Sequence, residues 1–199
     1  MKQLLLATHN RHKVEEFRAL LRGLEVEVLT LDSFPQVGEI VEDADTLEGN
    51  ALKKAREVFR FTGLPSVADD TGLEVRYLND TPGVLSSRYA GEHASYEDNW
   101  KKLLARLKGV PPRRRGARFR SVLAFVAPGV PGTTVEGSCL GDIIESPRGR
   151  NGFGYDPVFL PRGYQETFAE MKLDLKNTIS HRAKSLEALR PVLQSYFQP

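Results

Sequence analysis

The N-terminal segment of the chain joins an apolar run to a helical stripe through one short polar loop. Residues 3–8 predict a buried strand, and the polar loop that follows extends to Lys13. Apolar side chains then recur at the spacing of one helix face, at Val14, Phe17 and Leu21. A strand, a tight loop and a helix that begins near His12 form the opening of an α/β unit.

Two further helices are predicted from capping residues and apolar stripes. Thr46 is a predicted N-cap, and Gly63 with Pro65 ends the helix that follows. The inward face of that helix carries Leu47, Ala51, Ala55, Val58 and Phe59. Ser95 and Asp98 form a capping-box pattern ahead of the next helix.

Three strand candidates lie between and after these helices. Residues 66–75 have strand character, but we expect a break at residues 69–72 because two aspartates and a glycine stand there. Residues 117–127 form the longest strand candidate. Residues 135–144 are its predicted antiparallel neighbour, with the turn in residues 128–132.

The C-terminal part is predicted to contain a loop and one long helix. Residues 148–157 are glycine-rich and predict the loop, and the last helix is expected to run from about Ile179 to Tyr196. Strands and helices are mixed without strict alternation. We therefore expect an α/β fold over residues 1–199 as a single domain, with a mixed central sheet flanked by helices and two lobes around a substrate cleft.

Composition narrows the functional classes. The formal net charge of the 199 residues is only +2, which gives no whole-molecule argument for nucleic-acid binding. Cys139 is the single cysteine, so no intrachain disulfide can form and a reducing compartment is the simpler interpretation. No apolar run approaches the roughly 20 residues that span a bilayer. We expect a cytoplasmic protein without membrane or nucleic-acid partners.

The polar loop of residues 8–13 is a candidate phosphate site. Backbone N–H groups at a helix start and the helix dipole favour anions, and Arg11 and Lys13 add positive charge. Thr8 and Asn10 add short hydrogen-bonding groups. The competing interpretation is an ordinary polar loop with solvated charges, because such loops are common in α/β units.

Adjacent aspartates at positions 69 and 70 are a candidate metal site. Side chains on a strand alternate between faces, so both carboxylates cannot point into one core, and a buried carboxylate without a partner is costly. A turn that holds Mg²⁺ through one or both carboxylates fits the preference of hard cations for oxygen. An Asx-type turn without a metal is the alternative. The acidic residues Glu42, Asp43, Asp45 and Glu48 offer a second carboxylate, although acidic residues before a helix also serve its dipole.

Two segments of the C-terminal third are candidate nucleobase contacts. In residues 152–157, two glycines flank Phe153 and allow close backbone approach to a ligand, while the aromatic ring can stack on a base. A hairpin turn with a core aromatic is the alternative. In residues 176–182, polar and basic side chains gather at the predicted start of the last helix, where solvated surface residues are the alternative.

The most basic stretch of the chain contains Arg113, Arg114, Arg115, Arg118 and Arg120. Such a stretch can contact RNA or DNA. However, no aromatic residue lies between these arginines until Phe119, and two prolines precede them. We therefore interpret the segment as a solvated loop.

Taken together, the motifs resemble the inosine/xanthosine triphosphate pyrophosphatase family over essentially the whole chain. The matching positions, in order, are Thr8, Asn10 and Lys13; Asn50, Ala51 and Lys54; residues 68–73; Pro82-Gly83 through Ser87-Arg88-Tyr89; residues 152–157; and residues 179–182. The resemblance implies hydrolysis between the α- and β-phosphates of ITP, dITP or XTP, dependence on Mg²⁺, and a homodimer.

The same resemblance implies roles for individual residues. Phosphate contacts are implied for Thr8, His9, Asn10, Arg11, His12, Lys13 and Lys54. Asp70 would be the general base and a metal ligand, with Asp69 beside it as a further catalytic residue, and Thr71 would contact substrate. The nucleobase pocket would contain Phe153, Gly154, Tyr155, Asp156, Lys176, His181 and Arg182.

The chain departs from the family pattern at three places, and two other functions remain open. Paired glutamates of the family correspond here to Val41-Glu42, so Glu42 is the metal candidate, with Asp43 or Asp45 as alternatives. Gly49 replaces a frequent acidic residue, and His9 is bulkier than the usual residue. The competing functions are a septum-inhibitor-like (Maf-like) pyrophosphatase for modified pyrimidine nucleotides and an RNA-binding module.

Overall fold

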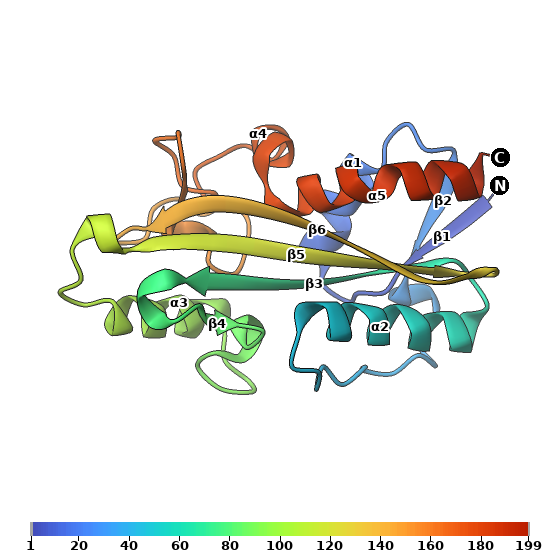
Figure 1. Ribbon diagram of the computed structural model, residues 1–199, viewed down its shortest axis with the longest axis horizontal. Coiled ribbons are helices and arrows are strands. Elements are labelled where there is room, and N and C mark those ends of the chain that lie inside the picture. The colour runs from blue at the N-terminus through green and yellow to red at the C-terminus, as the bar shows by residue number, and fades with distance from the viewer. Residues whose placement is uncertain (1, 199) are drawn as a thin grey trace. The chain divides into compact units, whose positions relative to one another are not determined.

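Within residues 2–198, which are the residues that the structure describes, the computed structural model has five α-helices and seven strands (Figure 1). The helices are α1 (Arg11–Leu20), α2 (Leu47–Thr62), α3 (Tyr96–Arg106), α4 (Leu173–Ile179) and α5 (His181–Phe197). The strands are β1 (Lys2–Leu6), β2 (Val26–Thr30), β3 (Ser66–Val75), β4 (Thr81–Gly83), β5 (Gly116–Ala127), β6 (Val130–Ile143) and β7 (Phe159–Pro161). Single 3₁₀ turns lie at Leu31–Ser33, Arg76–Leu78, Ser86–Arg88, Pro112–Arg114 and Asp156–Val158.

The strands form one mixed sheet in the order β2-β1-β3-β5-β6-β7, with β4 paired to β3. β1 is parallel to both β2 and β3, with Leu4 opposite Val28 and Leu6 opposite Val67. β4 and β7 are antiparallel to β3 and β6, respectively. Only two residues join the neighbouring strands β5 and β6, which is a hairpin connection. The predicted α/β class with a mixed sheet flanked by helices is confirmed.

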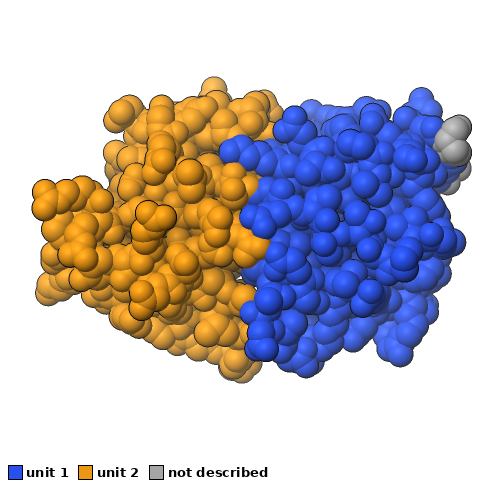
Figure 2. Space-filling model, in the orientation of Figure 1, with its two compact units in different colours: residues 1–70, 121–137, 182–199 blue, residues 71–120, 138–181 orange. Residues whose placement is uncertain are grey.

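The chain divides into two compact units, which are coloured separately in Figure 2. Unit 1 contains residues 1–70, 121–137 and 182–199, and unit 2 contains residues 71–120 and 138–181. Strands β3, β5 and β6 contribute residues to both units. In the described part of the chain, no helix combines the length and the apolar character that a membrane span requires.

Unit 1 is a βαβ arrangement with helices on both faces of its strands. α1 and α5 cover one face and α2 covers the other (Figure 1). The core under α1 and α5 joins strand residues such as Leu6 and Phe125 to Phe17 of α1 and Leu189 of α5. α2 begins at the N-cap Thr46, whose side chain accepts a hydrogen bond from Gly49 N–H, and ends at Gly63 with φ 69°. Both predicted ends of this helix are confirmed.

Unit 2 has its own hydrophobic core. α3 and α4 lie on opposite sides of β5 and β6 (Figure 1). Leu103 and Leu107 pack from the α3 region against aromatic residues that include Phe119, Phe159 and Phe168. The predicted capping box is present at the start of α3, between Ser95 and Asp98. Each unit therefore buries enough apolar surface to hold its functional side chains in place.

The predicted break at residues 69–72 is wrong, because β3 runs without interruption from Ser66 to Val75. The prediction rested on the rule that the side chains of two adjacent aspartates on a strand cannot both point into one core. They are both buried, and each has its own set of partners on its own face of the sheet. A buried carboxylate is tolerated where charged and hydrogen-bonding partners compensate it.

The predicted last helix is confirmed as α5, but the short helix α4 that precedes it was not predicted. Ser180 is extended, with φ −68° and ψ 158°, and separates the short helix α4 from α5. Ser is favoured in this conformation before a helix, because its side-chain oxygen can accept a hydrogen bond from a backbone N–H of the first turn. Lys176 therefore belongs to a different helix from His181 and Arg182. In addition, β6 begins at Val130 and not at Val135, which shortens the predicted turn.

Candidate active site

The loop between β1 and α1 places polar side chains at a helix N-terminus. Asn10 is the N-cap of α1, and its Oδ1 accepts hydrogen bonds from the backbone N–H groups of His12 at 3.0 Å and Lys13 at 3.3 Å. Thr8 Oγ1 accepts from the Asn10 N–H at 3.2 Å. The exposed side chains at this helix start are His9, Arg11 and His12. The predicted strand, loop and helix are confirmed, and the positive end of the helix is suited to an anion.

Asp69 lies at the centre of a buried charge network in unit 1. Its Oδ2 is 2.8 Å from Lys13 Nζ and 3.0 Å from Arg182 Nη2, and its Oδ1 accepts a hydrogen bond of 2.7 Å from Ser121. Arg182 also binds Glu16 through Nη1. Burial by itself would raise the pKa of Asp69, but Arg182 and Lys13 hold this pKa well below its ordinary value. Asp69 is therefore held as a carboxylate at neutral pH and neutralises two cations.

Asp70 points to the opposite face of β3, toward α2. Its Oδ1 is 3.3 Å from Lys54 Nζ, and its Oδ2 accepts a hydrogen bond of 3.2 Å from Asn50. Lys54 Nζ also lies 2.6 Å from Glu42 Oε1 and donates to the backbone carbonyl of Asp69 at 2.7 Å. The carboxylates of Glu42, in the acidic loop of residues 42–45, and of Asp70, on β3, therefore converge on the ammonium group of Lys54.

Burial raises the pKa of Asp70 above its ordinary value, and Glu42 adds to the shift while Lys54 opposes it. Burial lowers the pKa of Lys54, but the two carboxylates outweigh that effect, so the pKa of Lys54 lies above its ordinary value. Asp69 and Asp70 thus differ sharply although they are neighbours. Asp69 is held ionised, whereas Asp70 binds a proton more readily than an exposed aspartate does.

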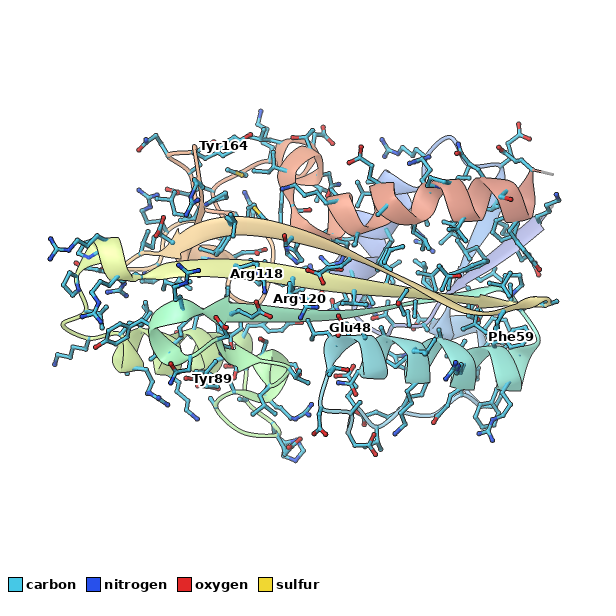
Figure 3. The ribbon with its side chains drawn as sticks, in the orientation of Figure 1. Glu48, Phe59, Tyr89, Arg118, Arg120 and Tyr164 are labelled. Atoms are coloured by element: carbon cyan, nitrogen blue, oxygen red, sulfur yellow. The ribbon has the colours of Figure 1, made fainter. Side chains whose placement is uncertain are left out.

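The other acidic residues of the loop are placed differently. Asp43 pairs with Lys53 at 2.7 Å; the Asp43 side chain is exposed and that of Lys53 is half-buried. Glu48 lies in the first turn of α2 (Figure 3), where a negative charge interacts favourably with the helix dipole. Asp45 is exposed. Of the three metal candidates, Glu42 is the one whose carboxylate reaches the Lys54 ammonium that also contacts Asp70.

In unit 2, Asp156 organises the loop that follows Gly152. Asp156 Oδ2 accepts a hydrogen bond of 2.9 Å from the Phe153 N–H and another of 2.6 Å from Lys176 Nζ. Lys176 Nζ also lies 5.2 Å from the centroid of the Phe153 ring. Gly152 has φ 71°, and a Cβ there would stand 2.0 Å from Asp156 Oδ2. This turn therefore requires glycine.

Two further predicted residues of unit 2 are buried beside the loop. Tyr155 donates its hydroxyl to the Ser86 carbonyl at 2.9 Å, and burial, with a smaller effect of Tyr89, raises the pKa of Tyr155. The His181 ring stacks on Phe119 with centroids 4.5 Å apart. Thr71 is half-buried on β3. Phe153, Asp156 and Lys176 are thus in direct contact, while Tyr155 and His181 pack into the core around them.

The family is decided by comparison with known proteins. A model described as the Ham1 family matches residues 4–192, which is nearly the whole chain. This chain belongs to the Ham1 family. The resemblance drawn from the motifs is thereby confirmed.

Relatives in the Ham1 family share close to half of their residues with the chain. A dITP/XTP pyrophosphatase of Geobacter sulfurreducens is 46% identical over 190 residues, which cover 96% of both chains. A dITP/XTP pyrophosphatase of Bacillus licheniformis is 48% identical over 193 residues, which cover 97% of this chain and 98% of the relative.

Solved structures of the family have the same fold. A HAM1 protein from Coxiella burnetii is 41% identical and superimposes with a TM-score of 0.88, covering 98% of this chain and 100% of its own. The nucleoside-triphosphatase / dITP/XTP pyrophosphatase from Mycobacterium abscessus is 43% identical with a TM-score of 0.72, covering 98% of this chain and 97% of its own.

Arg182 has a different environment in this Ham1 protein from the one predicted for it. The sequence placed it in the nucleobase pocket with Lys176 and Phe153. Its guanidinium is only 1% exposed and binds Asp69 and Glu16 in unit 1, while Lys176 and Phe153 belong to unit 2. Its contact with the base stays a prediction, and its contact with Asp69 is the new observation.

The sequence missed four residues of the unit 1 network. Glu16 is a buried carboxylate on α1, three residues after Lys13, and Ser121 is a buried hydroxyl just before the apolar run of residues 122–127 on β5. Ser185 shares a 3.1 Å hydrogen bond with Ser121. Asn50 belongs to a recognised motif, but no role was predicted for it. Their partners are distant in the chain, so the apolar patterns gave no signal for these roles.

The basic stretch of this Ham1 protein is mostly engaged within unit 2. Arg115 is buried and donates to the carbonyls of Ile143 and Ile144, so its interpretation as solvated is wrong. Arg118 and Arg120 follow each other along β5 (Figure 3) and both pair with Glu74, at 2.6 and 3.4 Å. Glu74 and Arg118 also line a cavity of about 650 Å³ that contains none of the predicted site residues.

Proposed function

We propose that this Ham1 protein is a nucleoside-triphosphate pyrophosphatase that hydrolyses the deaminated purine nucleotides ITP, dITP and XTP to the nucleoside monophosphate and pyrophosphate. The role would be to keep these nucleotides out of DNA and RNA. The names of the relatives support this substrate class. The observation that carries the proposal is the convergence of Glu42 and Asp70 on the ammonium of Lys54.

A cluster of positive charge supports the triphosphate part of the proposal. The ammonium groups of Lys13 and Lys54 both point at the backbone carbonyl of Asp69, at 3.5 and 2.7 Å. Lys13 also belongs to the first turn of α1, whose N-terminus favours anions. We assign the phosphates to these lysines and to the loop of residues 8–13. The two ammonium groups would stabilise the negative charge on the departing pyrophosphate.

The donor set fits a divalent cation, for which we propose Mg²⁺. Glu42 and Asp70 already converge on one cationic group, and Mg²⁺ is typically held by one or two carboxylates together with substrate phosphates and water. Among residues 2–198, no three His, Cys, Asp or Glu side chains are grouped to hold a metal by themselves, which agrees with a site completed by substrate. When bound, the ion would neutralise phosphate charge and lower the pKa of bound water.

Asp70 is the proposed general base. Burial raises the pKa of Asp70 in the metal-free protein. A bound cation would lower that pKa, but it would also acidify the attacking water, so the carboxylate would still suit removal of the proton. The hydrogen bond from Asn50 and the ion pair with Lys54 fix the orientation of both carboxylate oxygens. Asp69 is not the proposed base, because Arg182 and Lys13 hold its pKa well below the ordinary value.

Selection of the base is assigned to Phe153, Gly154, Tyr155, Asp156, Lys176, His181 and Arg182, with Thr71 as a further substrate contact. A 6-oxo group accepts hydrogen bonds, whereas the 6-amino group of adenine donates them, and a mismatched buried donor costs roughly 1–3 kcal/mol. The Phe153 N–H already donates to Asp156. The amides of Gly154 and Tyr155 are therefore the proposed donors to the 6-oxo group.

We propose further that the protein is a cytoplasmic homodimer, as the family resemblance implies. Light scattering coupled to size-exclusion chromatography measures the mass directly. A mass of twice the 22.2 kDa chain agrees with the proposal, and a mass of one chain contradicts it.

The test of the function is a product assay with Mg²⁺ and separate samples of ITP, dITP, XTP, GTP, ATP and UTP. We expect pyrophosphate from the first three and no orthophosphate. Equal cleavage of ATP and GTP would leave a nucleotide hydrolase but contradict the selectivity, and preferred cleavage of UTP would contradict the purine assignment. No product from any nucleotide would contradict the enzymatic function.

A further inference from the structure

Asn50 is a fully buried amide that joins two segments of unit 1. It lies in the first turn of α2 and has no exposed surface. Its Oδ1 accepts a hydrogen bond of 2.9 Å from the backbone N–H of Ala44, in the acidic loop. Its Nδ2 donates a hydrogen bond of 3.2 Å to Asp70 Oδ2, on β3. One side chain therefore contacts both segments that supply the proposed metal ligands.

An amide side chain supplies both the acceptor and the donor that these two bonds need. The Ala44 N–H is a donor and needs an acceptor, whereas the Asp70 carboxylate is an acceptor and needs a donor. This pairing also determines which end of the Asn50 amide faces which partner. An aspartate would place two acceptors against each other, and a leucine would leave both buried groups without a hydrogen bond.

We propose that Asn50 is a positioning residue that holds Glu42 and Asp70 toward the same cation. Ala44 is two residues from Glu42. Its hydrogen bond to Asn50 therefore holds the backbone of the loop next to Glu42 in place. The bond to Asp70 Oδ2 leaves Oδ1 directed at Lys54, the group that Glu42 also contacts. This inference rests on the proposed function of the site, and no role for Asn50 follows from the names of the relatives.

The chain contains a matched control in Asn99 of α3. Asn99 is 2% exposed and follows the N-cap Ser95 by four residues, as Asn50 follows the N-cap Thr46. Its Oδ1 accepts from the Ala90 N–H at 2.7 Å, and its Nδ2 donates to a carbonyl, that of Ser87, at 3.0 Å. The two asparagines differ in that only Asn50 meets a carboxylate.

The test compares Asn50→Leu with Asn99→Leu. Each variant removes two buried side-chain hydrogen bonds. Wild-type protein is assayed first with dITP, and its failure to release pyrophosphate would contradict the proposed function itself. Binding of Mn²⁺ is then followed by electron paramagnetic resonance with the α,β-imido analogue of dITP, which is not cleaved. This second readout does not depend on turnover.

We expect Asn50→Leu to lower kcat and the affinity for Mn²⁺ by about 10–100-fold each, as is typical when a partner of a metal ligand is removed. KM for dITP should change by less than about threefold, because Lys13 and the phosphate loop are untouched. Asn99→Leu should lose a similar amount of thermal stability while it keeps both kcat and the Mn²⁺ affinity.

Equal effects of the two leucine variants on kcat and Mn²⁺ binding would overturn the inference, because Asn50 would then be only structural. Asn50→Asp covers the case in which Asn50→Leu does not fold. It has the same shape, keeps an acceptor for the Ala44 N–H and lacks the donor to Asp70. We expect the same loss of kcat in this variant, and wild-type kcat together with wild-type Mn²⁺ affinity would also overturn the inference.

Discussion

At the level of single residues, the surroundings of Asp69 and Asp70 differ in the balance of charge and burial. Asp69 meets two cations and a hydroxyl, and its pKa falls well below the ordinary value despite complete burial. Asp70 shares its one ammonium with a second carboxylate, and its pKa rises. Successive side chains of a strand point to opposite faces. Asp69, which pairs with buried cations, and Asp70, the proposed base, therefore have different surroundings although they are adjacent on β3.

Asp69→Asn is expected to lower the free energy of unfolding by about 3 kcal/mol, because removal of one partner from a buried charge network leaves Arg182 and Lys13 without full compensation. Urea unfolding followed by circular dichroism measures this change. The exposed ion-paired residue Asp43 is the control, and Asp43→Asn should change stability by less than about 1 kcal/mol. Equal effects of the two variants would show that the network around Asp69 contributes little.

The contribution of Asp69 should also depend on pH. Its pKa is lower in the folded protein than in the unfolded chain, so its stabilisation is fully present above the unfolded value of about 3.9 and is lost as the pH falls through the folded pKa. The difference in unfolding free energy between wild type and Asp69→Asn should therefore shrink below about pH 4. A difference that stays constant down to pH 2 would contradict the ionised state of Asp69.

Asp70→Asn is expected to lower kcat for dITP by about 100-fold or more, because it removes the proposed general base. Stability at neutral pH should change little, since a carboxyl whose pKa is raised on folding gives no net stabilisation above its unfolded pKa. Pyrophosphate release and thermal unfolding are measured on the same preparation. Near-normal turnover in this variant would contradict the assignment of Asp70 as the general base. A loss of folding would show that Asp70, like Asp69, is needed for stability.

At the level of elements, the start of α1 has both a structural and a proposed binding role. Asn10→Ala removes the N-cap bonds to His12 and Lys13, and Thr46→Ala removes the equivalent bond of α2. Each change should lower stability by about 1 kcal/mol. Only Asn10→Ala should also raise KM for dITP, because α1 alone carries the proposed phosphate loop. Steady-state kinetics with urea unfolding separates the two effects, and equal KM values would argue against the phosphate assignment.

The loop of residues 152–156 offers a comparison between two glycines. Gly152 and Gly154 both have positive φ, 71° and 62°, so alanine is strained at either position by about 1–2 kcal/mol. A Cβ at Gly152 would collide with Asp156, whereas nothing lies within 4 Å of one at Gly154. Gly152→Ala should therefore destabilise the protein more than Gly154→Ala in urea unfolding. The reverse order would mean that the Asp156 contacts do not hold this loop.

The elements also show how far the sequence could be interpreted. Caps and apolar stripes predicted α2 and α3 correctly, because those signals are local. β3 was predicted to break because the partners of its aspartates, Lys13, Lys54 and Arg182, are distant in the chain. The candidate site residues were predicted from motifs, whereas the contacts of Glu16 and Asn50 are known only from the tertiary structure.

At the level of the whole molecule, the two units have separate cores but share three strands. We expect one cooperative unfolding transition, as for a single domain, because strands β3, β5 and β6 contribute to both units. Trp100, the one tryptophan of the chain, lies in unit 2 and reports its unfolding by fluorescence. Leu189→Ala in the unit 1 core should cost about 2–5 kcal/mol and shift the Trp100 signal equally.

Leu107→Ala is the matched change in the core of unit 2, where the leucine is also fully buried. It should shift both the Trp100 fluorescence and the far-ultraviolet circular dichroism by the same amount. If Leu189→Ala changes the circular dichroism transition and leaves the Trp100 transition in place, the units unfold independently and the single-domain interpretation is wrong.

The position of Lys54 between Glu42 and Asp70 has a consequence for the protein when divalent ions are scarce. Its ammonium is an internal counterion that offsets the repulsion between the two carboxylates in the metal-free state. Under the proposed scheme, depletion of Mg²⁺ would stop turnover without loosening the fold or exposing it to proteases. The metal-free enzyme would stay folded but inactive, and it would regain activity once the ion and the nucleotide bind.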